Sequence, residues 1–245
     1  MSAQLHQIES TPDLVERVYR ALLDAISTGS LQPGQRITQE DLAEQLAVSR
    51  QPVMQALRLL KKDGFVQDAP QVGAGAQRTR GLQVAPLGAD LITHVYQVRG
   101  ALDQLAVRLA AQQRTRIDPS LFACARSAVK RGDVAALIEA DMAFHSAIYR
   151  AAGNPLIEQS AQLHWHHIRR AMGLALQSHQ LRKPVWEEHE AIAHAIAEGD
   201  ARRAETLMAD HTGRAALTLA TQLAGTPSRD NPAPAEQLRG RRHNA

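Results

Sequence analysis

The sequence predicts a mainly α-helical protein, with a small N-terminal part that contains helices and strands and a larger, all-helical part behind it. Two short amphipathic segments joined by a turn predict the first part. Long segments with apolar residues at helical spacing, and no strand-like alternation beyond residue 86, predict the second. The composition agrees, because 44% of the residues are hydrophobic and only 3% are aromatic. Such a core must be aliphatic and rich in alanine, which favours helices.

The segment 38–66 predicts two short helices joined by a turn at Ala47 and Val48. Thr38 is placed to cap the first helix and Ser49 to cap the second. This layout is typical of a helix-turn-helix, whose second helix enters the major groove of DNA, although an ordinary helical hairpin is the alternative. The candidate DNA-contacting residues on the second helix are Ser49, Arg50, Gln51, Met54 and Arg58.

A β-wing is expected directly after the second helix. Phe65 and Val66 start a strand-like segment, and residues 77–84 resemble a returning strand. The net charge of +3 is too small to indicate nucleic-acid binding by itself, but basic residues concentrate on the second helix and the wing. Arg78 and Arg80 of the wing therefore join the candidate DNA contacts, since phosphate neutralisation requires such a cluster.

The stretch LAEQLAVSRQPVMQALRLLKKDGFV resembles the winged helix-turn-helix of the GntR superfamily. The residues that match the Ser-Arg-Thr-Pro-Val-Arg-Glu-Ala-Leu core of that family are Ser49, Arg50, Pro52, Val53, Ala56 and Leu57. Three positions depart from it: Ala47 replaces the preferred Gly of the turn, Met54 replaces a DNA-contacting Arg, and Gln55 replaces Glu. The resemblance implies binding to double-stranded DNA at a palindromic operator, and the departures bear on the operator sequence.

The predicted organisation has a winged helix-turn-helix domain over 1–85, an antiparallel helical bundle over 86–224 and a disordered tail over 225–245. The bundle helices are expected at 90–112, from 118 onward, 133–152, 154–178, 184–199 and 201–224. The lone Cys124 excludes an intramolecular disulfide and fits a reducing compartment. Neither a signal-peptide pattern nor a membrane-spanning apolar run occurs. We therefore expect a cytoplasmic protein with no membrane partner.

Four titratable residues lie on apolar seams of the bundle helices: Asp141, His145, His189 and His211. Burying them without partners would cost roughly 1 to 3 kcal/mol each. His189 lies ten residues before Gly199 and His211 twelve after it, so the two imidazoles sit at nearly the same height on antiparallel helices. Three imidazoles and one carboxylate are a plausible ligand set for Zn²⁺, with Ni²⁺ or Mn²⁺ as alternatives. A buried Asp-His hydrogen-bond network without metal is the competing interpretation.

The stretches DMAFHSAIYRAAGNPLI and EEHEAIAHAIAEGDARRAETLMADH resemble the C-terminal effector domain of FadR-type GntR regulators, the FCD domain. In that domain an Asp-x-x-x-His pair and two later histidines bind metal, so the resemblance implies the same four residues. VYQVRGALDQLA resembles its first helix, where an Arg faces the ligand pocket. This makes Arg99 an effector-binding candidate, against a surface ion pair with Asp103 at i+4. Whether one of His164, His166 and His167 joins the pocket is left open.

These features predict a homodimeric transcriptional regulator, expected to be a repressor, that binds a small organic acid at the metal. An enzyme is the first alternative, because zinc ligated by His and Asp can activate water. HEAIAH superficially resembles a zinc-protease motif, but its histidines are five residues apart, about 140° around a helix, so they do not share one face. A metal sensor is the second alternative. We expect a regulator and not an enzyme.

Overall fold

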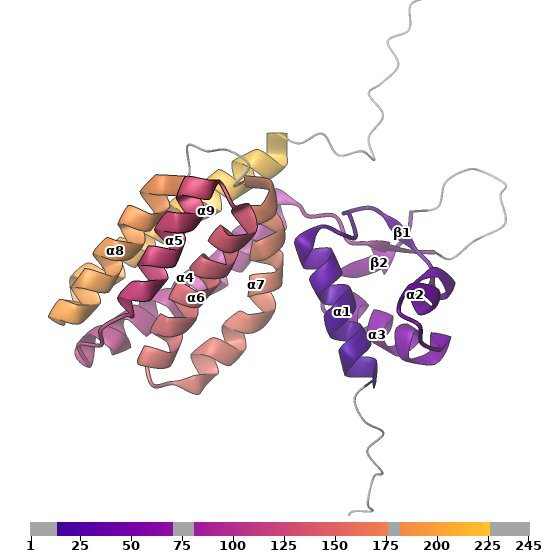
Figure 1. Ribbon diagram of the computed structural model, residues 1–245, viewed down its shortest axis with the longest axis horizontal. Coiled ribbons are helices and arrows are strands. Elements are labelled where there is room, and N and C mark those ends of the chain that lie inside the picture. Colours follow the sequence, from indigo (N-terminus) through magenta and orange to yellow (C-terminus); the bar gives the residue numbers. More distant parts are fainter. Residues whose placement is uncertain (1–13, 71–80, 176–181, 226–245) are drawn as a thin grey trace, which may run out of the picture.

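The computed structural model of the chain describes residues 14–70, 81–175 and 182–225, whose helices and strands are shown in Figure 1. These residues form two separate hydrophobic cores. The mainly helical fold class predicted from the sequence is confirmed. In chain order the elements are α1 (Leu14–Thr28), β1 (Arg36–Ile37), α2 (Gln39–Gln45), α3 (Arg50–Lys62), β2 (Val66–Asp68), β3 (Leu82–Val84), α4 (Ala89–Gln112), α5 (Pro119–Arg131), α6 (Val134–Ala151), α7 (Pro155–Ala175), α8 (Arg182–Glu198) and α9 (Ala201–Gly225).

The helix-turn-helix is formed by α2 and α3. The Thr38 hydroxyl accepts a hydrogen bond from the Asp41 amide at 3.1 Å, which is the predicted N-cap of α2. Ser49 occupies the N-cap position of α3, but its side chain makes no capping hydrogen bond, so the prediction that it caps that helix is wrong for the hydroxyl. Ala47 in the turn has φ of 52°. That left-handed conformation disfavours a side chain with a Cβ atom, which explains why glycine is preferred at this position.

The wing is a three-stranded antiparallel sheet in the order β1-β3-β2. Val66 pairs with Val84 and Gln67 with Gln83, so the returning strand predicted from the sequence is present over its last residues. Its earlier part, including Arg78 and Arg80, lies outside the described residues. The sheet closes the small core beside α1 and α3 because Val66 and Val84 are fully buried there.

The bundle contains α4 to α9, and local sequence signals explain several of its helix ends. The Asp118 carboxylate accepts from the Ser120 amide at 2.8 Å with Pro119 in the first turn, and the Asp133 carboxylate accepts from the Ala136 amide at 3.0 Å. The start of α8 differs from the prediction, because the helix begins at Arg182 and Pro184 lies inside its first turn, where proline is tolerated. The predicted end of α7 and nearly all of the tail lie outside the described residues.

The bundle meets the winged domain through α7, which lies beside α1 (Figure 1). His166 Nδ1 is 3.2 Å from the Ser27 hydroxyl, and the His167 ring stacks on Phe65 with 4.2 Å between ring centroids. Arg170 donates to the Ala85 carbonyl at 2.6 Å. One helix therefore contacts both the first helix of the winged domain and the residues that directly adjoin its strands β2 and β3.

Candidate functional site

The outer face of α3 exposes the predicted DNA-contacting residues. Ser49, Arg50, Gln51 and Arg58 are exposed, and Met54 is half-buried among them. Arg50 pairs with Glu40 of α2 at 2.8 Å, and both side chains remain largely exposed. An exposed ion pair of this kind contributes little to stability, so the guanidinium remains available to an anionic partner.

A second group of predicted residues converges inside the bundle. Asp141 and His145 come from α6, His189 from α8 and His211 from α9, and each offers a ligand atom within 4.8 Å of the others. His189 Nε2 lies 3.2 Å from His211 Nε2 and 3.5 Å from an Asp141 oxygen. All four residues are buried. The structure therefore brings together the four side chains that the sequence analysis identified, including His189 and His211 at matching heights.

The lowered pKa values of two histidines in this cluster suit a cation. Burial, with the Arg99 charge as the next cause, lowers the pKa of His145, and burial lowers the pKa of His189 well below its usual value. Among the described residues, His145 Nε2 is a buried cluster nitrogen without a hydrogen-bond partner. Neutral imidazoles and a carboxylate are the forms that bind divalent metal ions. The donor set and the unpaired His145 nitrogen thus fit such an ion.

Glu188 orients His211 through the ring nitrogen that faces away from the cluster. Its carboxylate lies 2.8 Å from His211 Nδ1 and accepts a hydrogen bond from Arg214 Nε at 3.0 Å. Burial opposes ionisation of Glu188, but the hydrogen bonds from His211 and Arg214 outweigh it, and its pKa is lowered. A proton held on Nδ1 leaves the Nε2 lone pair of His211 directed at the cluster.

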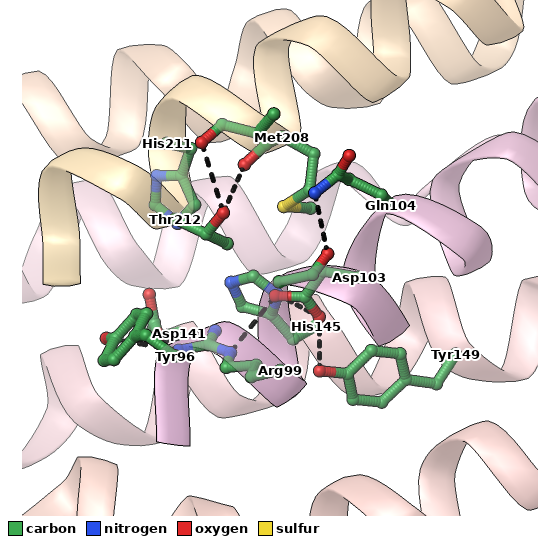
Figure 2. A network of polar contacts seen from close by, with 12 residues as sticks. Tyr96, Arg99, Asp103, Gln104, Asp141, His145, Tyr149, Met208, His211 and Thr212 are labelled. Atoms are coloured by element: carbon green, nitrogen blue, oxygen red, sulfur yellow. Dashed lines mark hydrogen bonds and ion pairs between the residues drawn. The ribbon is translucent and has the colours of Figure 1, made fainter. Parts of the chain in front are cut away.

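Arg99 lies beside the cluster in a buried polar network (Figure 2). Its Nε is 3.1 Å from Asp103, and its guanidinium lies over the Trp165 ring, 4.2 Å from the centroid. Burial raises the pKa of Asp103, but the Arg99 charge outweighs that effect and holds it at about 2. The alternative of a surface ion pair is therefore wrong, because the Arg99–Asp103 pair exists but is buried.

A cavity of about 220 Å³ adjoins both the cluster and the buried network. It lies between α4, α6, α7, α8 and α9, and Arg99, Asp141 and His211 line one part of it. The apolar side chains of its wall are Leu137, Met172, Pro184, Val185, Trp186, Ala215 and Leu219. A small molecule in this cavity would contact the four-residue cluster and Arg99 together.

Both parts of the chain match known families. The gntR family of bacterial regulatory proteins matches residues 14–75, and the FCD domain matches residues 94–214. The HTH-type transcriptional regulator LutR of Bacillus subtilis is 30% identical over 211 residues, which cover 76% of this chain and 92% of LutR. The chain belongs to the GntR family.

Other GntR-type proteins agree over most of the chain. An uncharacterized HTH-type transcriptional regulator of Streptomyces ambofaciens is 29% identical over 199 residues, covering 79% of this chain and 80% of that relative. The solved structure of E. coli McbR/YncC has a TM-score of 0.69 at 21% identity and covers 86% of this chain and 98% of that one. At this identity the structural likeness shows the fold.

This GntR-family chain is a transcriptional regulator and not an enzyme, so the hydrolase alternative is wrong. GntR regulators bind DNA, which is the partner expected from the exposed face of α3. No described helix combines the length and the apolar composition that crossing a membrane requires.

The structure also answers where the three neighbouring histidines of this GntR-family chain lie. His166 and His167 contact the winged domain, and His164 is half-buried on the same helix. None of the three lies in the four-residue cluster or along the described wall of the cavity. His166 and His167 therefore lie at the interface between the bundle and the winged domain.

Sequence reasoning missed several residues around the site. Glu188 directly precedes His189, and Tyr149 lies one helical turn after His145, so both had a local signal in their spacing. The Tyr149 hydroxyl of α6 donates a hydrogen bond to the Asp103 carboxylate of α4. Trp165, by contrast, reaches Arg99 only through the packing of α7 on α4, and no pattern within one helix indicates that contact.

Proposed function

We propose that this GntR-family regulator is a ligand-responsive repressor that acts as a homodimer on a palindromic operator. Its bundle binds a divalent metal ion, with Zn²⁺ as the first candidate, through Asp141, His145, His189 and His211. It also binds a small organic acid beside Arg99. The observation that carries the proposal is the convergence of four buried ligand side chains at the edge of a cavity that Arg99 also lines.

An ion bound there would act as a Lewis acid and attract an anionic oxygen of the effector. The chain's own residues would do the rest. Arg99 presents a planar guanidinium to the cavity, which suits a carboxylate, and Asp103 holds that guanidinium in place at 3.1 Å. Tyr96, which also lines the cavity, lies 3.3 Å from the same guanidinium.

The position of α7 supports a response at the DNA. Trp165 of α7 lies on Arg99, while the next two residues, His166 and His167, contact Ser27 and Phe65 of the winged domain. A shift of Arg99 on effector binding would therefore act on the same turn of α7 that packs against the winged domain. Differential contact of this kind is what a ligand needs to change a conformational equilibrium.

A metal-sensing regulator is a second candidate, because four protein ligands are enough to complete a tetrahedral zinc site. In a sensor, metal alone would change the affinity for DNA. In an effector-responsive protein with a resident ion, DNA affinity would change only when the acid is added to the metal-loaded form.

Native mass spectrometry tests the metal in this proposal. Full-length wild-type protein is expected to retain one ion per chain, and His211→Ala to lower metal affinity by more than about 100-fold, since loss of a supporting contact alone costs about 10- to 100-fold. The melting temperature with metal should fall in parallel.

His194→Ala is the matched control. His194 also lies on a bundle helix, but its side chain is 65% exposed and pairs with Glu198. Equal metal retention in the His211→Ala and His194→Ala proteins would refute the proposed site.

A further inference from the structure

We propose that the effector is a monocarboxylate with an apolar body, and that di- and tricarboxylates are rejected. This inference rests on the proposed function, because it takes the divalent ion and an acid effector as given. It adds the chemical class of acid, which follows from the charge of the site and the composition of the cavity wall.

Among the side chains that the structure describes, the charges around the cavity leave one positive charge for an anion. Arg214 lines the cavity, but Glu188 neutralises it at 3.0 Å. Arg99 and a divalent ion together bring three positive charges, and Asp103 and Asp141 bring two negative ones. Neutral imidazole ligands add none. The single remaining positive charge balances one carboxylate.

A second carboxylate on the same effector would enter the cavity without a counter-charge among the described residues. Asp103 is fully buried and Asp141 is 5% exposed, so the existing negative charges are poorly screened by water. Burying one more unpaired anion beside them is costly. A dicarboxylate should therefore lose the affinity that a matching monocarboxylate has.

The wall away from the polar end is apolar. Leu137, Trp186 and Leu219 are buried residues that line it, with Met172 and Val185 beside them. Apolar groups of an effector that pack against this wall are removed from contact with water. Their burial contributes about 0.8 kcal/mol of binding free energy for each methylene group, or about fourfold in affinity. The cavity volume of about 220 Å³ is below the range of about 300 to 1,000 Å³ for drug-sized ligands. A six-carbon chain is of suitable size.

Isothermal titration calorimetry of the zinc-loaded full-length protein with acetate, hexanoate and adipate tests this class. Hexanoate and adipate have the same six-carbon chain and differ in the second carboxylate. We expect hexanoate to bind at least about tenfold more tightly than adipate, because of the unpaired charge. It should bind about 250-fold more tightly than acetate, because each of the four added methylene groups contributes about fourfold.

A pair of variants on α9 locates the apolar body. Ala215 lines the cavity and is half-buried, so Ala215→Phe should fill the space and lower hexanoate affinity by about tenfold. Zinc content is measured in parallel, so that a loss of hexanoate binding is distinguished from a loss of metal. Ala224→Phe, at an exposed position of the same helix, is the matched control and should keep the wild-type affinity for hexanoate.

The outcomes separate this inference from the function on which it rests. Adipate binding as tightly as hexanoate, or full hexanoate affinity in the Ala215→Phe protein, would overturn the monocarboxylate class while leaving an acid effector in place. Absence of binding by all three acids to protein that retains its zinc would overturn the acid effector itself, and the inference with it.

Discussion

Asp103 shows how one residue can serve several functional groups in this protein. It is fully buried, pairs with Arg99, accepts a hydrogen bond from Tyr149 and lies 3.5 Å from His145 Nδ1. Its carboxylate therefore connects the guanidinium that faces the cavity with an imidazole of the cluster. An i, i+4 spacing predicted the Arg99–Asp103 pair from the sequence, but its burial depends on the other helices that pack against α4.

Arg50 is the residue on which we expect DNA recognition to depend most. It begins α3 and is exposed, but in the free protein it pairs with Glu40. Arg50→Ala should weaken operator binding by about 1 to 3 kcal/mol if Arg50 reads a base, without loss of thermal stability. Gel-shift titration at fixed salt measures the effect. Arg20→Ala, which removes an equally exposed arginine paired with Glu16 on α1, should leave operator affinity unchanged; equal losses in both variants would contradict a specific role.

The four cluster residues were identifiable from the sequence because each stands on an otherwise apolar helical seam. The heights of His189 and His211 could also be calculated, since a helix rises by a constant amount per residue from the turn at Gly199. The distances between these side chains could not be predicted from the sequence, because they depend on how α6 packs against α8 and α9. Glu188 illustrates the limit: its neighbour His189 was identified, but its contact with His211 needs two helices in register.

At the scale of elements, α7 is the piece that joins the two cores. Its Trp165 is 5% exposed and packs in the bundle, while His167, two residues later, is 6% exposed and packs on Phe65 of the winged domain. Arg169 adds contacts to Asp24 of α1 at 2.8 Å and Glu139 of α6 at 2.9 Å. Consecutive residues of a helix point in different directions, so a short stretch of α7 can contact both domains.

The same interface should make stability depend on pH. Burial lowers the pKa of His167 to about 4, with the charged or titratable neighbours Arg170, His164 and His166 acting in the same direction. The unfolded state, with a pKa near 6.5, therefore takes up the proton first. The contribution of His167 to folding is complete above pH 6.5 and is lost as the pH falls towards 4, by at most about 3 kcal/mol.

Thermal unfolding of the full-length chain at pH 7.5 and pH 5 measures this dependence. His167→Phe keeps an aromatic ring on Phe65 and removes the titrating group, so the loss of melting temperature between the two pH values should shrink. His94→Gln changes an exposed histidine and should keep the wild-type pH dependence. An unchanged pH dependence in the His167→Phe protein would show that the interface does not titrate as proposed.

Element boundaries were predictable where a cap or a backbone constraint fixes them. Thr38, Asp118 and Asp133 cap the helices that they precede. Pro184 was misleading, because proline fits anywhere in a first turn and α8 begins two residues earlier. Ser49 has the residue type and position of a cap, but no capping bond forms, so residue type alone does not determine the hydrogen bond.

At the scale of the whole molecule, the fold was predictable to the level of two parts and their helices. The apolar seams determine which face of each helix is buried, and the two cores correspond to the two predicted parts. The contact between them was not predictable. It depends on His166, His167 and Arg170 meeting Ser27, Phe65 and Ala85, and these pairs are at least 85 residues apart in the chain.

The central claim is that one divalent ion binds among Asp141, His145, His189 and His211. Anomalous X-ray scattering at the zinc edge, from crystals of zinc-loaded full-length protein, tests it most directly. We predict one strong peak per chain inside the bundle, about 2.0 to 2.2 Å from three imidazole nitrogen atoms and an Asp141 oxygen. No peak among these four side chains, or zinc bound only at exposed histidines such as His94 and His194, would contradict it.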